Sequence, residues 1–280
     1  MNIGIVTDEV SRNLREALDI TREWGISHYE LREGSESRTP YLTNDEIGLV
    51  EERLREGAII TALSPGVFKQ PVENEAEIRN DLERKLPATL ELADRFDCST
   101  VIIFGFEKLK NDRASRLGVQ RVFEQAASLA EQAGIVLAIE NEPAFWIDKP
   151  SDSVGMIEEI DHPSLKLNWD PANLHWGGTR PTPDHVEMLA PYIRNLHVKD
   201  FTPTDVQIPW RPLGEGETPW SELLAALNEV TDSGILKLGQ YTIETHWEPL
   251  IDGSRRSLER LLELFSEIGI KTFVGTTNAK

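Results

Sequence analysis

The sequence predicts a single (β/α)8 TIM barrel, an α/β fold in which eight parallel strands alternate with helices. Short apolar runs and amphipathic stretches take turns along the chain, and its 280 residues fit one complete barrel over residues 1–280. Four of the apolar runs end on Glu140, Asp170, His197 and Glu244, at intervals of about 30, 27 and 47 residues. In a barrel, strand ends at such intervals meet on one face.

Eight runs have the length and residue types of strands. They are Ile3–Val6, His28–Arg32, Ile59–Leu63, Val101–Phe104, Ile135–Glu140, Leu165–Asp170, Ile193–His197 and Gln240–Glu244. Between them, apolar residues recur three and four positions apart, as in amphipathic helices, and several stretches end in glycine. Examples are residues 14–25, 44–57, 78–96 and 119–134. Strict alternation of this kind indicates a parallel sheet, here a closed one.

The four polar strand ends are predicted to face the inside of the barrel. Alternate residues of a strand point to opposite faces, so each strand end shares its face with the residue two positions earlier. These inward companions are Ala138, Asn168, Asn195 and Thr242. The opposite faces carry apolar residues, namely Ile139, Trp169, Leu196 and Ile243. We expect the apolar faces to lie under the helices and the four polar ends to meet.

Three carboxylates and one imidazole form an oxygen-rich donor set. Such a set suits one divalent metal ion, with Mn²⁺ as the first expectation and Mg²⁺, Co²⁺ or Zn²⁺ as alternatives. A cluster of three zinc ions would need more histidines than the 6 in the chain can supply at the strand ends. His175 and His246 are expected in loops just past Asp170 and Glu244, where either can touch a substrate.

Further residues near the strand ends have the chemistry to handle a substrate. Lys199 shares its face with His197 and can donate to a substrate oxygen, the alternative being a surface lysine. Arg211 lies in a proline-rich connection, 201–218, that is long enough to form a lid. It can clamp an oxygen or a carboxylate, or form a structural salt bridge.

Two other patterns concern the same end of the barrel. Glu30 and Arg32 share one face of the second strand, which predicts an ion pair inside the barrel, the alternative being a role in handling the substrate. Tryptophans follow several of the strands expected at the site, where flat rings can enclose it and stack on the C–H face of a sugar. They are Trp146, Trp176, Trp210 and Trp247. Packing within the loops is the alternative interpretation.

Composition excludes several classes of function. The formal net charge of −19 and a sequence pI near 4.8 argue against a nucleic-acid partner, which needs a basic surface. The longest apolar runs are about six residues, far short of the ~20 that span a bilayer. Cys98 is the single cysteine, and the first strand begins near Met1 without a signal segment. We expect a cytoplasmic protein whose partner is a small sugar or polyol.

Several segments carry a family resemblance. They are VTDEVSRNLREAL, HYELREG, LAIENEP, NWDPANLHWGG, NLHVKDF, RPLGEGETPW and YTIETH. Over nearly its whole length the chain resembles the xylose isomerase-like barrel family of sugar phosphate isomerases and epimerases. The resemblance implies that Glu140, Asp170, His197 and Glu244 are the metal ligands and that Glu140 and Glu244 also form the acid/base pair. Relatives are often dimers or tetramers, which implies a homo-oligomer.

One position departs from the family pattern. Many relatives place a histidine three residues after the metal-binding aspartate, where this chain has Asn173. The departure weakens the related reading as an endonuclease IV-like phosphodiesterase, which needs a histidine there. The residues expected to bind substrate are Asn173, His175, Lys199, Arg211, Trp176 and His246.

The predicted function is that of a metal-dependent isomerase or epimerase of a sugar, keto-sugar or related polyol. One glutamate would remove a proton from a carbon next to a carbonyl and the other would return one, through a metal-stabilised enediolate. The alternatives are a dehydratase of the same barrel, of keto-inositol or dehydroshikimate type, the phosphodiesterase, and a non-catalytic binding protein.

Overall fold

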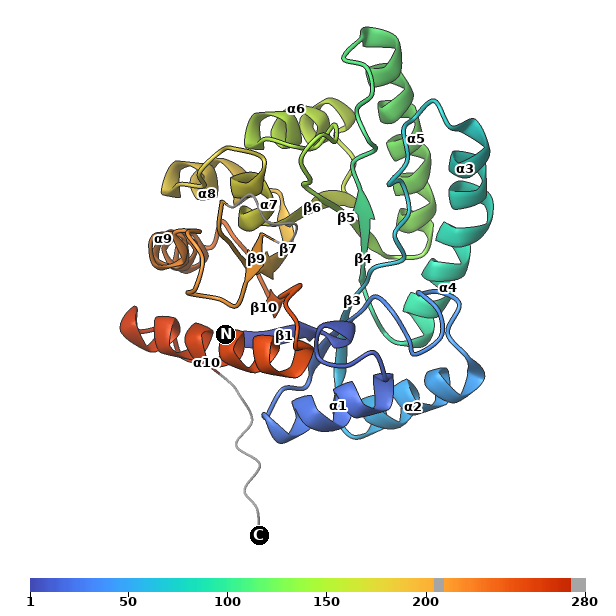
Figure 1. Cartoon of the computed structure of the whole chain (residues 1–280). Coiled ribbons are helices and arrows are strands. Elements are labelled where there is room, and N and C mark those ends of the chain that lie inside the picture. Colours follow the sequence, from blue (N-terminus) through green and yellow to red (C-terminus); the bar gives the residue numbers. More distant parts are fainter. Residues whose placement is uncertain (204–208, 273–280) are drawn as a thin grey trace.

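A computed structural model describes residues 1–203 and 209–272, which form a closed barrel of eight parallel strands ringed by helices (Figure 1). The strands follow one another around the barrel in the order β1 (Asn2–Val6), β10 (Gln240–Ile243), β7 (Ile193–Val198), β6 (Leu165–Trp169), β5 (Val136–Glu140), β4 (Thr100–Phe104), β3 (Ile59–Leu63) and β2 (His28–Leu31). Strand β1 pairs in parallel with both β10 and β2, which closes the ring. The predicted barrel and its eight strands are confirmed.

The helices follow the strands along the chain, as the sequence predicts. They are α1 (Leu14–Glu23), α2 (Asn44–Arg55), α3 (Glu75–Asn80), α4 (Leu86–Arg95), α5 (Arg113–Gln132), α6 (Pro150–Ile160), α7 (Pro171–Trp176), α8 (Pro183–Leu189), α9 (Trp220–Asp232) and α10 (Leu250–Glu267), with short helices η1 (Thr7–Glu9) and η2 (Asp81–Lys85). Within residues 1–203 and 209–272, no helix is long and apolar enough to cross a membrane.

Local sequence signals account for where helices begin and where one is interrupted. A capping box of Thr43 and Glu46 starts α2, because each side chain accepts the other residue's backbone N–H. The expected helix 78–96 is divided by the wide turn η2, which precedes Pro87. Proline has no N–H to donate to the preceding turn, which is the physical reason for the wider turn.

Side chains alternate across the barrel wall as predicted. The outward residues Ile139, Trp169 and Ile243 are at most 1% exposed and belong to the apolar layer between strands and helices. A separate small apolar cluster of Ala62, Ile102 and Ala138 fills part of the barrel interior. Because apolar packing holds the strands from outside, the interior can carry polar side chains toward the carboxyl ends of the strands.

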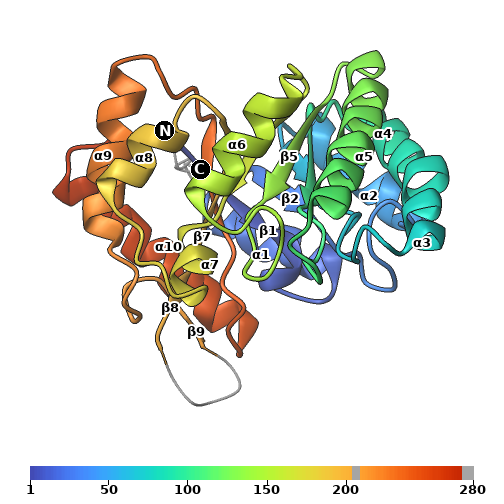
Figure 2. The same ribbon diagram turned by 90° about the horizontal axis from the view of Figure 1, so that it is seen from above.

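The connection after β7 contains a short hairpin that the sequence did not predict. Strand β8 (Asp200–Phe201) pairs antiparallel with β9 (Trp210–Arg211), and Figure 2 shows both projecting beside α7. Residues 204–208 of the expected lid lie outside the described residues. The lid function therefore stays a prediction.

Asp200 anchors this hairpin through its buried carboxylate. It accepts backbone N–H groups from Phe201 at 2.8 Å, Gly214 at 2.9 Å, Gly216 at 3.2 Å and Thr218 at 3.0 Å. A Cβ atom on Gly216 would lie 2.3 Å from Oδ1 of Asp200, so the close approach requires glycine there. Asp200 thus holds both ends of this connection through backbone N–H groups.

Candidate active site

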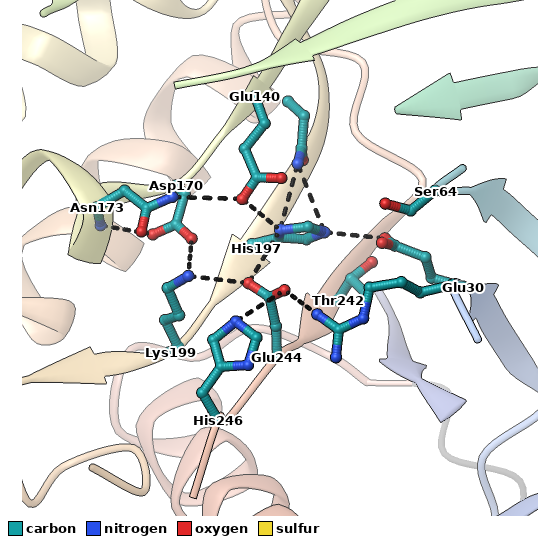
Figure 3. Close-up of polar contacts among 12 residues, drawn as sticks. Glu30, Ser64, Glu140, Asp170, Asn173, His197, Lys199, Thr242, Glu244 and His246 are labelled. Carbon is teal, nitrogen blue, oxygen red and sulfur yellow. Dashed lines mark hydrogen bonds and ion pairs between the residues drawn. The ribbon is translucent and has the colours of Figure 1, made fainter. Parts of the chain in front are cut away.

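The four polar strand ends meet at the carboxyl end of the barrel. Glu140 ends β5, Asp170 follows β6, His197 lies in β7 and Glu244 follows β10. One potential ligand atom from each lies within 4.8 Å of the others, and each residue is at most 4% exposed. Figure 3 shows the four side chains converging from different strands. The predicted meeting of these residues is therefore seen in the structure, while their roles stay predictions.

The imidazole of His197 presents its two nitrogens to different neighbours. Nδ1 lies 3.4 Å from Oε1 of Glu140 and 3.3 Å from Oε2 of Glu244, so this nitrogen faces the cluster. Nε2 lies 2.9 Å from Oε2 of Glu30, on the other side of the ring. Burial acts to lower the pKa of His197, but the surrounding glutamates raise it well above its ordinary value.

Asp170 is held by the start of α7 and by a neighbouring loop. Its Oδ1 atom accepts the backbone N–H of Asn173 at 2.9 Å, which caps the helix. Its backbone N–H donates to Oδ1 of Asn141 at 2.8 Å, and the amide of Asn141 donates back to its carbonyl at 2.9 Å. These bonds leave the buried Oδ2 atom facing the cluster, where Nζ of Lys199 lies 2.8 Å from it.

The residues fit a divalent metal ion. Three buried carboxylates so close together repel one another, and burial raises the pKa of Asp170. Oδ2 of Asp170 and Nδ1 of His197 offer donor atoms beside the two glutamates. Oxygen donors with a single imidazole suit Mn²⁺, Mg²⁺, Co²⁺ or Zn²⁺.

Lys199 supplies one positive charge to this cluster. Its Nζ atom lies 2.8 Å from Oδ2 of Asp170 and 3.0 Å from Oε2 of Glu244 (Figure 3), and 4.4 Å from the centre of the Trp210 ring. Burial would lower the pKa of Lys199, but Asp170 and Glu244 raise it, so the ammonium stays charged. Lys199 is 3% exposed, which excludes the alternative of a surface lysine.

The predicted ion pair between Glu30 and Arg32 is wrong. Glu30 points across the barrel to His197, whereas Arg32 lies beyond the end of β2 and reaches the loop after β1. There Nη2 of Arg32 lies 2.5 Å from both Asp8 and Glu9, and Nη1 lies 2.7 Å from Oε1 of Glu244. Sharing a face within one strand did not decide the pairing, because both residues found partners in other elements: Glu30 in β7 and Arg32 in η1 and after β10.

His246 joins the same network from the loop after β10. Its Nδ1 atom lies 2.7 Å from Oε1 of Glu9, and Nε2 lies 3.2 Å from Oε1 of Glu244. Burial acts to lower the pKa of His246, but Glu244 and Glu9 raise it to about 9. Sequence reasoning missed Asp8 and Glu9, although they directly follow the first strand, which is the signal that identified the other four.

The remaining expected substrate-binding residues lie around this centre at different depths. Asn173 is buried and its amide donates to Oε1 of Glu140 at 3.3 Å, so it holds a candidate ligand. His175 was expected in a loop but lies in α7, and its ring packs 5.2 Å from that of Phe201. The expected contact between His175 and substrate stays a prediction.

Aromatic rings lie on the side of the site formed by α7 and the hairpin. Trp176 is 50% exposed and its ring lies 5.3 Å from that of Trp210, which lies 5.9 Å from the His246 ring. Arg211 in β9 stacks 5.1 Å from the Trp247 ring. These rings form an apolar surface beside the charged cluster.

Comparison with known proteins identifies a family and a curated relative. A family model described as a xylose isomerase-like TIM barrel matches residues 18–264. A 3-dehydroshikimate dehydratase of Bacillus anthracis is 25% identical over 116 residues, a match that spans only 41% of that relative and 41% of this chain.

Two solved structures show how far the likeness in fold extends. A D-tagatose 3-epimerase-like protein superposes with a TM-score of 0.78 at 20% identity, covering 96% of this chain and 98% of that chain. The IOLI protein, solved with a bound zinc atom, has a TM-score of 0.78 at 14% identity, covering 96% and 99%. At these identities, the likeness shows a shared fold.

Proposed function

Because the chain belongs to the xylose isomerase-like TIM barrel family, we propose that it is a divalent-metal-dependent isomerase or epimerase. Its substrate would be a sugar, a keto-sugar or a related polyol. The D-tagatose 3-epimerase-like protein of the same fold supports this class of reaction.

The observation that carries the proposal is the pair of glutamates that face one nitrogen from two sides. Glu140 comes from β5 and Glu244 from the end of β10, with β6 and β7 between them in the barrel wall. Their nearest oxygens lie 3.4 Å and 3.3 Å from Nδ1 of His197. A proton can therefore be taken from one side of a bound substrate and returned from another.

Each residue of the cluster has a part in the proposed reaction. Glu140, Asp170, His197 and Glu244 would hold the metal ion. When bound, this ion supplies positive charge that stabilises the oxygen of a carbonyl whose neighbouring carbon loses a proton. One glutamate takes that proton, the C–H electron pair moves toward the carbonyl, and the other glutamate, which has taken up a proton from solvent, returns one. Return to the opposite face of the same carbon gives epimerisation. Return to the former carbonyl carbon, with the neighbouring hydroxyl proton passing to the other oxygen, gives isomerisation.

Neighbouring side chains would orient the substrate. Lys199 can donate a hydrogen bond to a substrate oxygen, because its ammonium lies at the cluster and keeps its charge. Trp210 and the exposed Trp176 offer flat faces to the C–H groups of a sugar ring. General base action by a positioned carboxylate contributes about 10² to 10⁴ in rate.

Proton exchange with solvent tests the proposal. The Mn²⁺-loaded protein would be incubated in D₂O with ketoses, ketohexose phosphates, hydroxypyruvate and keto-inositols, and deuterium uptake read by NMR. We expect uptake at a carbon next to a carbonyl, reduced by about 10²-fold or more in both Glu140→Gln and Glu244→Gln. Glu222→Gln, an exposed glutamate paired with Arg180 on the surface, is the matched control and should keep full exchange.

Two results would count against the proposal. Exchange that persists in both glutamate variants would remove them from proton transfer. A purified protein that retains no divalent metal and shows no exchange with any compound would favour a non-catalytic binding role.

A dehydratase is the second candidate, favoured by the partial match to the 3-dehydroshikimate dehydratase. The same glutamate would remove a proton, and the electron pair would then expel a β-hydroxyl, which takes a proton from the other glutamate and leaves as water. Dehydroshikimate, added to the panel beside the keto-inositols, distinguishes the two candidates. Loss of water lowers the mass of the product by one water molecule, and isomerisation leaves the mass unchanged.

A further inference from the structure

We propose that Glu30 is a positioning residue that keeps the proton of His197 on Nε2 when a metal ion binds at Nδ1. Two buried amides, Asn195 and Asn168, would hold the two side chains in place. The inference rests on the proposed metal site, but it concerns metal binding alone and is independent of the reaction that follows.

The burial of Glu30 calls for a compensating partner. The residue lies in β2, inside the barrel, and is 1% exposed. Moving a carboxylate out of water is costly unless it is paired and hydrogen-bonded. Its Oε2 atom lies 2.9 Å from Nε2 of His197, which comes from β7 on the other side of β1 and β10. This contact crosses the barrel interior and does not join neighbouring strands.

The chemistry of the two partners determines the position of the proton. When Glu30 is ionised, its carboxylate only accepts hydrogen bonds, so the nitrogen that faces it carries the hydrogen. A histidine that binds a metal ion keeps one N–H, and with that hydrogen on Nε2 the lone pair lies on Nδ1. Nδ1 is the nitrogen that faces Glu140 and Glu244. The arrangement therefore directs the free lone pair toward the cluster.

A second neighbour holds the ring in place. The amide nitrogen of Asn168 lies 3.2 Å from Nδ1 of His197 and 3.5 Å from Nε2. Because it is almost equally close to both nitrogens, it lies over the face of the ring. Asn168 therefore helps to fix the orientation of the ring and leaves the metal-facing side of Nδ1 open.

A row of buried amides sets the orientation of Asn168. Asn195 donates from Nδ2 to Oδ1 of Asn168 at 3.0 Å and, more weakly, to Oε2 of Glu30 at 3.4 Å. Its own Oδ1 accepts from Gln240 at 2.9 Å. Each amide accepts a hydrogen bond at its oxygen and donates one from its nitrogen. The hydrogen bond from Gln240 to Asn195 therefore sets the orientation of Asn195, which in turn sets that of Asn168. This explains why the inward positions of β6 and β7 carry asparagine where an apolar side chain would be less costly to bury.

Zinc binding and the state of the imidazole together test the role of Glu30. Zn²⁺ alone would be titrated by competition with a chelating dye into the native protein, Glu30→Gln and Glu30→Ala. Partners of metal-ligating histidines affect affinity by about 10- to 100-fold, so we expect Kd to rise about 10-fold in Glu30→Gln and toward 100-fold in Glu30→Ala. ¹⁵N NMR of the zinc-loaded native protein should show the His197 proton on Nε2 and zinc at Nδ1.

Asp81→Asn is the matched control for removing a buried carboxylate. Asp81 is 4% exposed and accepts hydrogen bonds from Phe68 and Gln70, with no contact to the cluster. Its variant should bind zinc with native affinity.

Three outcomes would overturn the proposal. The first is a ¹⁵N NMR spectrum of the zinc-loaded native protein that shows zinc bound at Nε2, a result that does not depend on any variant. The second is a Kd within twofold of native in both Glu30 variants. The third is weaker binding in Glu30→Gln with an unchanged Nε2–H signal, since that would be an effect of charge alone.

Discussion

Replacing Arg32 with methionine tests whether the charge network around the site stabilises the barrel. The guanidinium lies 2.5 Å from Asp8, 2.5 Å from Glu9 and 2.7 Å from Glu244, and its side chain is 14% exposed. Methionine keeps much of the side-chain volume but leaves three largely buried carboxylates without this partner.

The expected loss in the free energy of unfolding follows from the geometry. Unit charges about 4 Å apart attract by about 4 kcal/mol at an effective dielectric constant near 20, before the cost of desolvation. Removing one partner of a buried ion pair typically costs about 3–5 kcal/mol. His246 still faces Glu9 and Glu244 in the variant, so we expect the lower end, about 3 kcal/mol. For a domain of this size, that corresponds to a fall in Tm of roughly 6–12 °C.

The loss should also depend on pH. Burial raises the pKa of Glu9, but His246 and Arg32 lower it to about 2 in the native protein. Its stabilising effect is present above the ordinary value of 4.5 and disappears as pH falls through about 2. Without Arg32 the carboxylates protonate more readily, so the difference in stability between native protein and variant should shrink from pH 7 toward acid.

Calorimetry and urea denaturation in excess EDTA would measure the effect without bound metal. Arg22→Met is the control, because Arg22 pairs with Glu56 on the surface, where such pairs contribute below about 1 kcal/mol. If Arg32→Met lowers the free energy of unfolding by as little as Arg22→Met does, the charge network around Arg32 does not stabilise the barrel.

Three further predictions concern the surroundings of the site. The pKa of His246 is about 9 against an ordinary 6.5, so its stabilising effect is complete below pH 6.5 and is lost as pH rises through 9. In EDTA, His246→Gln should therefore lower the free energy of unfolding by about 1–2 kcal/mol near pH 6 and by almost nothing above pH 9.5, whereas an equal loss at both would contradict this. Asp200→Ala should lower that free energy by roughly 2–4 kcal/mol, because four backbone N–H groups lose their acceptor. Faster proteolysis between β8 and β9 would accompany the loss, and a native cleavage rate would argue against the anchoring role. Trp210→Ala should raise KM for a substrate found by the exchange assay by about 10-fold, since stacking and the contact with Lys199 are lost, and an unchanged KM would exclude the ring from binding.

Much of the fold could be predicted from the sequence because the signals are local. The lengths of the apolar runs, their alternation with amphipathic stretches and the residues that cap helices all act over a few positions. The row of strand ends then follows from the topology of a parallel barrel, which brings every carboxyl end to one face. For that reason Glu140, Asp170, His197 and Glu244 could be predicted to meet.

The partners inside the barrel depended on the tertiary structure. Glu30 and Arg32 share one face of a strand, yet one crosses the interior to His197 and the other reaches Asp8 and Glu9. The hairpin of β8 and β9 likewise depends on Asp200 gathering N–H groups from residues up to 18 positions away. Pairings of this kind are decided by distances across the closed barrel, and a linear pattern of residues carries no measure of those distances. The sequence by itself thus determined the barrel and the ring of four candidate ligands, and the folded chain decided which charges hold them in place.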